Sequence, residues 1–164
     1  MLKLVVIALL VGLDQLVKFL VKTNISMGEH VDFIPYILGL NHIHNTGAAF
    51  SMLSGARWFF VVLTVVVVIG MLYVLLAKKI THPFGVWSMV LVVGGAIGNL
   101  IDRVLYGYVV DMFEVLFMNF AIFNVADIFV VVGGIAFCVY YAFIHDKYVA
   151  KQKAKEQESH EDPQ

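Results

Sequence analysis

The chain has 164 residues, of which 61% are hydrophobic and only 14% are charged, and its mean hydropathy is +0.89. A soluble domain of this size carries about a quarter charged residues, so the composition indicates an integral membrane protein and argues against a soluble one. The net charge of −1 offers no basic field for a nucleic-acid partner, and a single cysteine, Cys138, excludes an internal disulfide framework.

The first predicted element is an uncleaved membrane helix at about residues 3–22. Lys3 precedes a short apolar core, as in a signal peptide, but no small-x-small cleavage motif follows it. The apolar pattern continues past Asp14 and Lys18, which are four residues apart and therefore share a helix face. That spacing suits a salt bridge inside a helix bundle at least as well as it suits chemistry.

The connection at about residues 24–56 is predicted to form a small β-sheet outside the helices. Apolar and polar residues alternate from Leu38 to Ile43, which is typical of a strand, and Asn45-Thr-Gly is a turn signal. His42 and His44 would share one face of this strand, but no third side chain has the spacing of a metal ligand. Neither a metal nor another cofactor is therefore expected.

Three further stretches are long and apolar enough to cross a bilayer, at about residues 58–77, 84–103 and 123–145. Their β-branched residues would favour strands in water, but in lipid the backbone must satisfy its own hydrogen bonds, so helices are expected. Gly94–Gly98 carries a spacing of small residues that lets helices pack closely. The predicted fold is a single membrane α-helical domain, 1–146, with four transmembrane helices, followed by a polar tail, 147–164, of frayed helix or disorder.

Lysines in the connections gather on one side of this topology, at Lys3, at Lys78–Lys79 and in the tail. The positive-inside rule makes that side the cytoplasm and places both termini there. The unusual polar residues of the helices then converge in the outer half of the bilayer or at its outer surface. They are Asp14, Lys18, Asn99, Asp102, Arg103, Asp111, Asn124 and Asp127.

Asp111 and Asp127 are the candidate catalytic residues in this group, because no lysine or histidine lies near either in the sequence. Two carboxyls brought together in a partly dry site share one proton. Such a pair can activate a water with one member and hold a carbonyl oxygen with the other, which is aspartic-protease chemistry. Two acids also suit a proton-coupled transporter, and Asn99, Asp102 and Arg103 could equally clamp two helices together.

Five motifs, in this order, resemble those of the lipoprotein signal peptidases, the bacterial signal peptidase II family. They are DQLVK (14–18), NTGAAF (45–50), GGAIGNLIDR (94–103), VVD (109–111) and FNVAD (123–127). Together they extend over nearly the whole chain except its tail.

The resemblance implies an intramembrane aspartic endopeptidase of the bacterial cytoplasmic (inner) membrane. Such an enzyme removes the signal peptide from prolipoproteins by cleaving before the diacylglyceryl-modified cysteine of the lipobox. The resemblance assigns Asp111 and Asp127 to the catalytic pair. The residues that it implies to bind substrate or brace the site are Asp14, Lys18, Asn45, Gly47, Asn99, Asp102, Arg103, Asn124 and Ala126.

The resemblance further implies four membrane helices, an extracytoplasmic β-cradle between the first two, and a flexible loop before the last. It places the active site toward the outer face and implies inhibition by globomycin-type cyclic peptides. Lipidated prolipoproteins and membrane lipid are the expected partners of a monomeric enzyme. A small four-helix proton-coupled transporter is the alternative, although transporters often carry internal repeats and this chain shows no matching halves.

Overall fold

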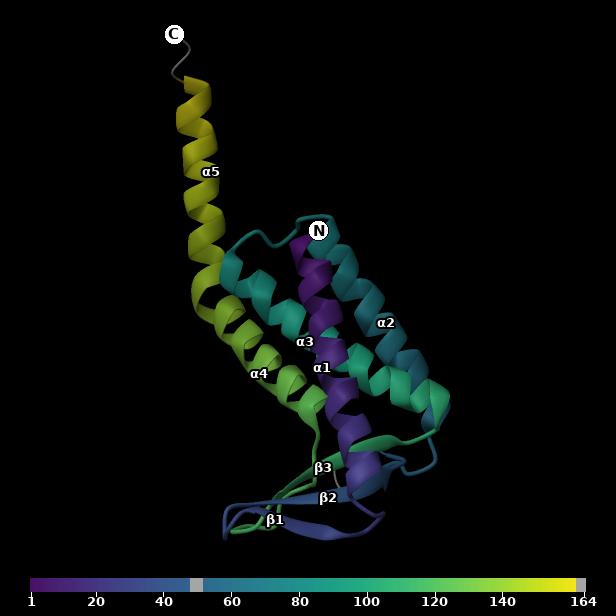
Figure 1. Ribbon diagram of the computed structural model, residues 1–164. Coiled ribbons are helices and arrows are strands. Elements are labelled where there is room, and N and C mark those ends of the chain that lie inside the picture. The colour runs from purple at the N-terminus through teal and green to yellow at the C-terminus, as the bar shows by residue number, and fades with distance from the viewer. Residues whose placement is uncertain (48–51, 162–164) are drawn as a thin grey trace.

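The computed structural model describes residues 1–47 and 52–161, and it consists of long helices with a small sheet at one end (Figure 1). The membrane helices are α1 (Leu2–Asn24), α2 (Arg57–Leu76), α3 (Pro83–Leu105) and α4 (Val125–Tyr140). Four helices in the described part of the chain are long and apolar enough to cross a membrane. The predicted membrane α-helical fold class is therefore confirmed.

The sheet has three antiparallel strands in the order β1-β2-β3, with bounds His30–Ile34, Leu38–Asn45 and Val109–Val115. The first two strands come from the connection between α1 and α2, as predicted. The third comes from the connection between α3 and α4, for which no strand was predicted.

Pairing of β3 with β2 brings Asp111 close to the turn that follows β2. Asp111 lies opposite Ile43, and Val109 lies opposite Asn45. Because paired residues of antiparallel strands share a face and side chains alternate along a strand, Asp111 and Asn45 project from the same face of the sheet.

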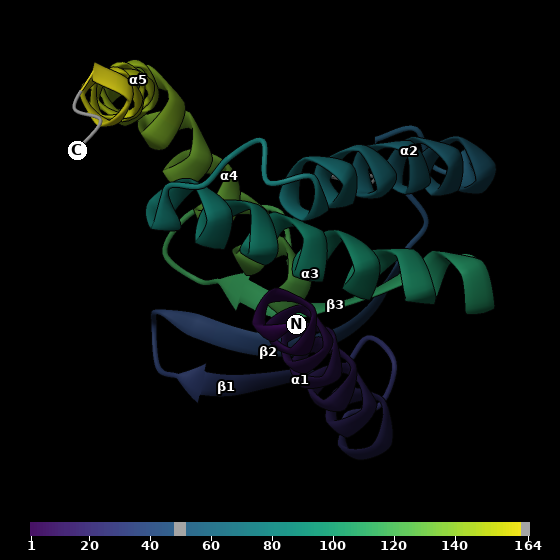
Figure 2. The same cartoon turned by 90° about the horizontal axis from the view of Figure 1, so that it is seen from above.

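α3 is the central helix and packs against each of the other three membrane helices (Figure 2). Its glycines allow this close approach. A Cβ at Gly98 would lie 2.6 Å from a carboxylate oxygen of Asp14 on α1, and one at Gly95 would collide with the carbonyl oxygen of Ala126 on α4. The predicted packing role of Gly94–Gly98 is therefore confirmed.

Buried side chains form two clusters at opposite ends of the bundle. The larger joins α1, α2 and α3 at the end away from the sheet and includes Ile7, Val68, Leu75, Met89, Val90 and Val93. The smaller packs the last turn of α1 onto β3 through Val21, Val110 and Met112. Large apolar side chains on α2, such as Trp58 and Val66, are exposed, which is stable in contact with lipid and not with water.

The N-terminus and α5 (Asp146–Glu161) lie at one end of the bundle, and the sheet lies at the other (Figure 1). α4 continues into α5 through a π-helical turn, Tyr141–His145. The polar tail is therefore helical as far as Glu161, and its many lysine, glutamate and glutamine residues are good helix formers. Residues 48–50 of the NTGAAF motif and residues 162–164 of the tail lie outside the described residues.

Candidate active site

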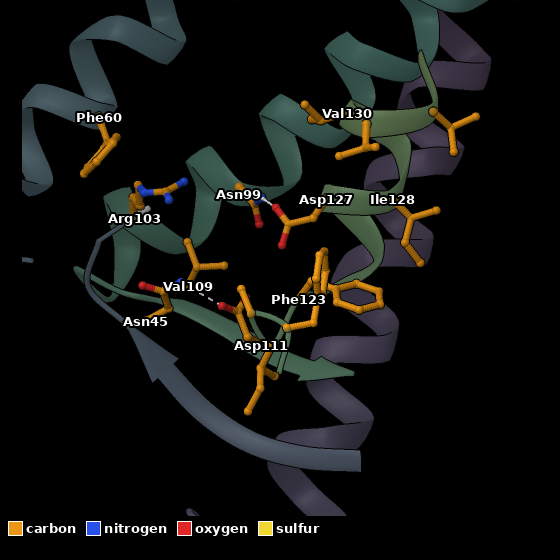
Figure 3. A pocket seen from close by; sticks show the side chains of 15 residues that line it. Asn45, Phe60, Asn99, Arg103, Val109, Asp111, Phe123, Asp127, Ile128 and Val130 are labelled. Carbon is orange, nitrogen blue, oxygen red and sulfur yellow. Dashed lines mark hydrogen bonds between the residues drawn. The ribbon is translucent and has the colours of Figure 1, made fainter. Parts of the chain in front are cut away.

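A pocket of about 550 Å³ lies at the sheet end of the bundle, between the sheet and helices α2, α3 and α4 (Figure 3). Its polar lining consists of Asn45, Asn99, Arg103, Asp111 and Asp127. The other lining side chains are apolar and include Phe60, Phe120, Phe123 and Val130. A mostly apolar pocket with a few converging polar groups is typical of a ligand-binding site.

Asp127 is held at the start of α4 by a reciprocal capping box with Asn124. The Asp127 backbone N–H donates to the Asn124 side-chain oxygen at 2.9 Å, and the Asn124 backbone N–H donates to the Asp127 carboxylate at 3.1 Å. These bonds satisfy N–H groups that the first turn of a helix leaves without partners. They also explain why α4 begins at Val125, two residues later than predicted. The second carboxylate oxygen of Asp127 accepts from the Asn99 side-chain amide at 2.7 Å.

Asp111 is held by two side-chain amides from different parts of the chain. Asn45 donates to one carboxylate oxygen at 2.8 Å, and Asn124 donates to the other at 2.7 Å. The side-chain oxygen of Asn45 accepts from the Gly47 N–H, and that of Asn124 accepts from the Asp127 N–H. Both asparagines are thereby oriented with their NH₂ groups toward Asp111.

Burial raises the pKa of Asp111 from its usual 3.8 to about 6. The hydrogen bonds from Asn45 and Asn124 lower this pKa, because they favour the ionised carboxylate, while the charge of Asp127 raises it. The Asp111 side chain is only 3% exposed. This carboxyl is therefore suited to carry the proton when the pair holds one.

Asn124 and Asn99 connect the two carboxyls. The Asn124 amide donates to Asp111 and also lies 3.1 Å from the side-chain oxygen of Asn99, whose own amide donates to Asp127. Figure 3 shows Asp111, from the sheet, and Asp127, from α4, turned into the same pocket. Two carboxyls with amide donors on their oxygens and an apolar wall beside them can perform acid–base chemistry on a bound carbonyl.

A buried charge cluster of Asp14, Lys18 and Asp102 lies behind the pocket. The Lys18 ammonium is 2.9 Å from the Asp14 carboxylate and 3.1 Å from the Asp102 carboxylate, and each of the three side chains is at most 3% exposed. Lys18 also donates to the side-chain oxygen of Asn99 at 2.9 Å. The possible salt bridge between Asp14 and Lys18 is thus present, but one ammonium serves two carboxylates.

The remaining residues that the resemblance assigned lie in the same network. Arg103 donates to the carbonyl oxygen of Gly47 at 3.1 Å, and its guanidinium lies 5.2 Å from the centre of the Phe60 ring. The Ala126 backbone N–H donates to the Asp14 carboxylate at 2.9 Å. The structure therefore brings every predicted site residue into or directly beside one hydrogen-bonded site.

Gln15 also belongs to this network, although it was not among the predicted site residues. Its side-chain Nε2, which carries two N–H groups, lies within hydrogen-bonding distance of three acceptors: Asp14 at 3.2 Å, Asp102 at 3.0 Å and the carbonyl oxygen of Gly98 at 3.1 Å. Its place beside Asp14 in the DQLVK motif was the only signal in the sequence that could have identified it.

The fold and the site together are those of a membrane protein whose pocket is suited to the chemistry of an aspartic peptidase. A family model described as signal peptidase (SPase) II matches residues 6–143 of the chain. The chain belongs to the signal peptidase II family.

Relatives and solved structures agree with this membership. A lipoprotein signal peptidase of Enterococcus faecalis is 50% identical over 148 residues, which cover 88% of this chain and 89% of the relative. One from Streptococcus pyogenes serotype M2 is 48% identical over 131 residues, covering 77% and 84%. A structure described as a bacterial membrane enzyme, determined by the in meso method, has a TM-score of 0.80 at 31% identity and covers 88% of both chains. A second, described in the same way, has a TM-score of 0.78 at 30% identity and covers 87% of this chain and 93% of its own.

The protein is accordingly an aspartic endopeptidase that removes the signal peptide from prolipoproteins. The alternative of a proton-coupled transporter has no support from these relatives.

Proposed function

We propose that Asp111 and Asp127 are the catalytic pair, and that they cleave prolipoproteins immediately before the diacylglyceryl-modified cysteine. The observation that supports this most directly is the pocket, in which two amide-held carboxyls from different elements meet. Its other walls are apolar side chains of membrane helices and of the segment before α4. Such walls suit a substrate made of an apolar signal peptide and lipid chains.

In the proposed mechanism, the ionised carboxyl takes a proton from a water placed between the pair, and that water attacks the scissile carbonyl carbon. The protonated carboxyl donates a hydrogen bond to the oxyanion that develops. The carbon–nitrogen bond then breaks, and a proton passes to the departing amine of the cysteine. The raised pKa of Asp111 favours this residue as the protonated member at the start.

The other site residues would orient this pair and the substrate. Asn45, Asn99 and Asn124 hold the carboxyls by the amide hydrogen bonds described above. Arg103 fixes the turn after β2 through the Gly47 carbonyl, and Ala126 links the start of α4 to Asp14. A globomycin-type cyclic peptide would occupy the same pocket. The proposed working unit is a monomer surrounded by membrane lipid, and the exposed apolar side chains of α2, such as Trp58 and Val66, suit contact with lipid.

A cleavage assay with two matched substrates tests this function. The purified protein in detergent is given a diacylglyceryl-modified prolipoprotein and the same chain without lipid, and the products are identified by mass spectrometry. The lipidated chain should yield a product that begins at the modified cysteine, and a globomycin-type peptide should block this cleavage. Cleavage at another bond, or equal rates with both substrates, would contradict the proposal.

The pH dependence of kcat/KM provides a second prediction. The pair needs one proton, so kcat/KM should fall as the pH rises through the pKa of Asp111, which is about 6. Asn45→Ala removes a hydrogen bond that lowers this pKa, so the alkaline limb of the profile should move to higher pH. Profiles of both proteins, measured with the lipidated substrate, check this. A limb that stays in place or moves to lower pH would exclude Asp111 as the group that titrates.

We also propose that both termini are cytoplasmic and that the sheet and pocket face outward. In support, the N-terminus and α5 lie at the same end of the bundle, where the lysines of the connections also gather (Figure 1). In a Cys138→Ala background, Met27→Cys should react with a membrane-impermeant thiol reagent added to intact cells. Gln157→Cys, which is also exposed in the structure, should react only after permeabilisation. The opposite labelling pattern would reverse the orientation.

A further inference from the structure

The two carboxyls of the proposed catalytic pair lie on different elements, so their separation depends on how β3 is held relative to α4. The residue before each of them is attached to the buried charge cluster. The Val110 backbone N–H donates to the Asp102 carboxylate at 3.1 Å, and the Ala126 backbone N–H donates to the Asp14 carboxylate at 2.9 Å. A change in the distance between Asp14 and Asp102 would therefore move β3, which carries Asp111, relative to the start of α4, which carries Asp127.

Asp14 and Asp102 come from different helices and carry like charges, so each repels the other. Lys18 lies between them and attracts both. Gln15 adds a second bridge: its amide nitrogen is within 3.2 Å of Asp14 and within 3.0 Å of Asp102. The same nitrogen lies 3.1 Å from the carbonyl oxygen of Gly98 on α3, where a Cβ would lie 2.6 Å from the Asp14 carboxylate.

We propose that Gln15 is a positioning residue for the peptidase reaction, which ties Asp14 to Asp102 and thereby sets the separation of the two catalytic carboxyls. The inference rests on the assignment of Asp111 and Asp127 as the catalytic pair. Gln15 is neutral and half-buried, so its replacement changes the geometry of the cluster without leaving a charge unpaired. A substitution of Lys18 would change the geometry and the charge balance of the cluster together, because it leaves two buried carboxylates without their cation.

The geometry makes a specific prediction about kinetics. Among the described residues, the pocket is lined by neither Gln15 nor the two carboxylates that it bridges, so substrate binding should be unaffected. A shift of about 1 Å in a catalytic group can cost roughly a hundredfold in rate. Carboxyls that move apart also share their proton less strongly, which lowers the upper pKa of the pair.

Gln15→Met tests the proposal, because methionine has nearly the same length but no amide donor. We expect kcat per folded molecule to fall roughly tenfold to a hundredfold, KM to stay within about twofold, and the alkaline limb to move to lower pH. Leu75→Ala is the matched control, since Leu75 is 2% exposed in the core at the far end of the bundle. It should reduce thermal stability and leave both kcat per folded molecule and the pH profile unchanged.

Gln15→Lys provides the rescue, because its ammonium can donate to both of the carboxyl groups that the Gln15 amide contacts. Its kcat should lie well above that of Gln15→Met. If Gln15→Met does not fold, Gln15→Asn replaces it, since the shorter amide cannot reach both carboxylates. A Met or Asn variant with the kcat and pH profile of Leu75→Ala overturns the proposal, and so does a folded Lys variant as slow as the Met variant. Failure of the catalytic-pair assignment would look different, because Asp111→Asn or Asp127→Asn would then remain active.

Discussion

Asp111→Asn and Asp127→Asn should each lower kcat by about 10³-fold to 10⁴-fold while the protein still folds and inserts. An amide can neither accept the proton of the attacking water nor donate one as an acid. Asparagine nevertheless keeps the shape of the side chain. At Asp127 one retained oxygen can still accept a hydrogen bond from Asn99 or from the Asn124 backbone.

At Asp111 the same change has two opposing effects on stability. Both carboxylate oxygens accept from asparagine amides whose own oxygens are already bonded, so the new NH₂ group would face a donor. The change also removes a buried carboxyl that ionises unfavourably, as its raised pKa records. We therefore expect a melting temperature near that of the wild type, together with the loss of turnover.

The measurement is kcat on the lipidated prolipoprotein beside a melting curve for each variant. Asp32→Asn is the control, because it makes the same chemical change at an exposed aspartate on β1, away from the pocket. It should cleave at the wild-type rate. Near-normal turnover in either purified site variant would remove that residue from the mechanism.

Lys18→Met should destabilise the protein more than any other single change in the charge cluster. Removing one partner from a buried ionic group costs about 3–5 kcal/mol, because the remaining charge is left without compensation. Here one ammonium lies within 3.1 Å of two carboxylates, and all three side chains are almost fully buried. Asp14→Asn should cost less, because Lys18 keeps its contact with Asp102.

The double variant Lys18→Met with Asp14→Asn should recover part of the stability lost in Lys18→Met, since one stranded carboxylate is then neutralised. Melting curves in detergent for the wild type, both single variants and the double variant give this comparison. If Lys18→Met melts like the wild type, or if the two losses simply add, the cluster does not hold the bundle together through its charges.

The sequence predicted the elements whose signals are local. Length and continuous apolarity predicted the four membrane helices. In lipid, a single segment can form all its backbone hydrogen bonds within itself only as a helix. Alternation from Leu38 to Ile43 predicted the strand that became β2. The spacing of Asp14 and Lys18 indicated their salt bridge, because residues four apart on a helix are neighbours wherever the helix lies.

The third strand was not predictable in this way, although the five motifs together identified the family. Residues 109–115 become a strand because they pair with β2, and that pairing joins Asn45 to Asp111 across 66 residues of sequence. No local periodicity encodes such a contact. The start of α4 could have been predicted locally, because FNVAD contains the capping box of Asn124 and Asp127. The prediction followed the apolar run instead and began the helix two residues too early.

The amino-acid sequence by itself determined that this is a four-helix membrane protein, and its motifs identified two aspartates as the candidates for chemistry. Only the tertiary structure decided that these aspartates share one pocket, that Asp102 joins Asp14 and Lys18 in one cluster, and that Gln15 bridges the two carboxylates of that cluster. Helices follow from the hydrophobicity and backbone hydrogen bonds of a single segment. A shared pocket and a buried cluster depend on contacts between segments far apart in the chain, which form only when the bundle and the sheet pack together.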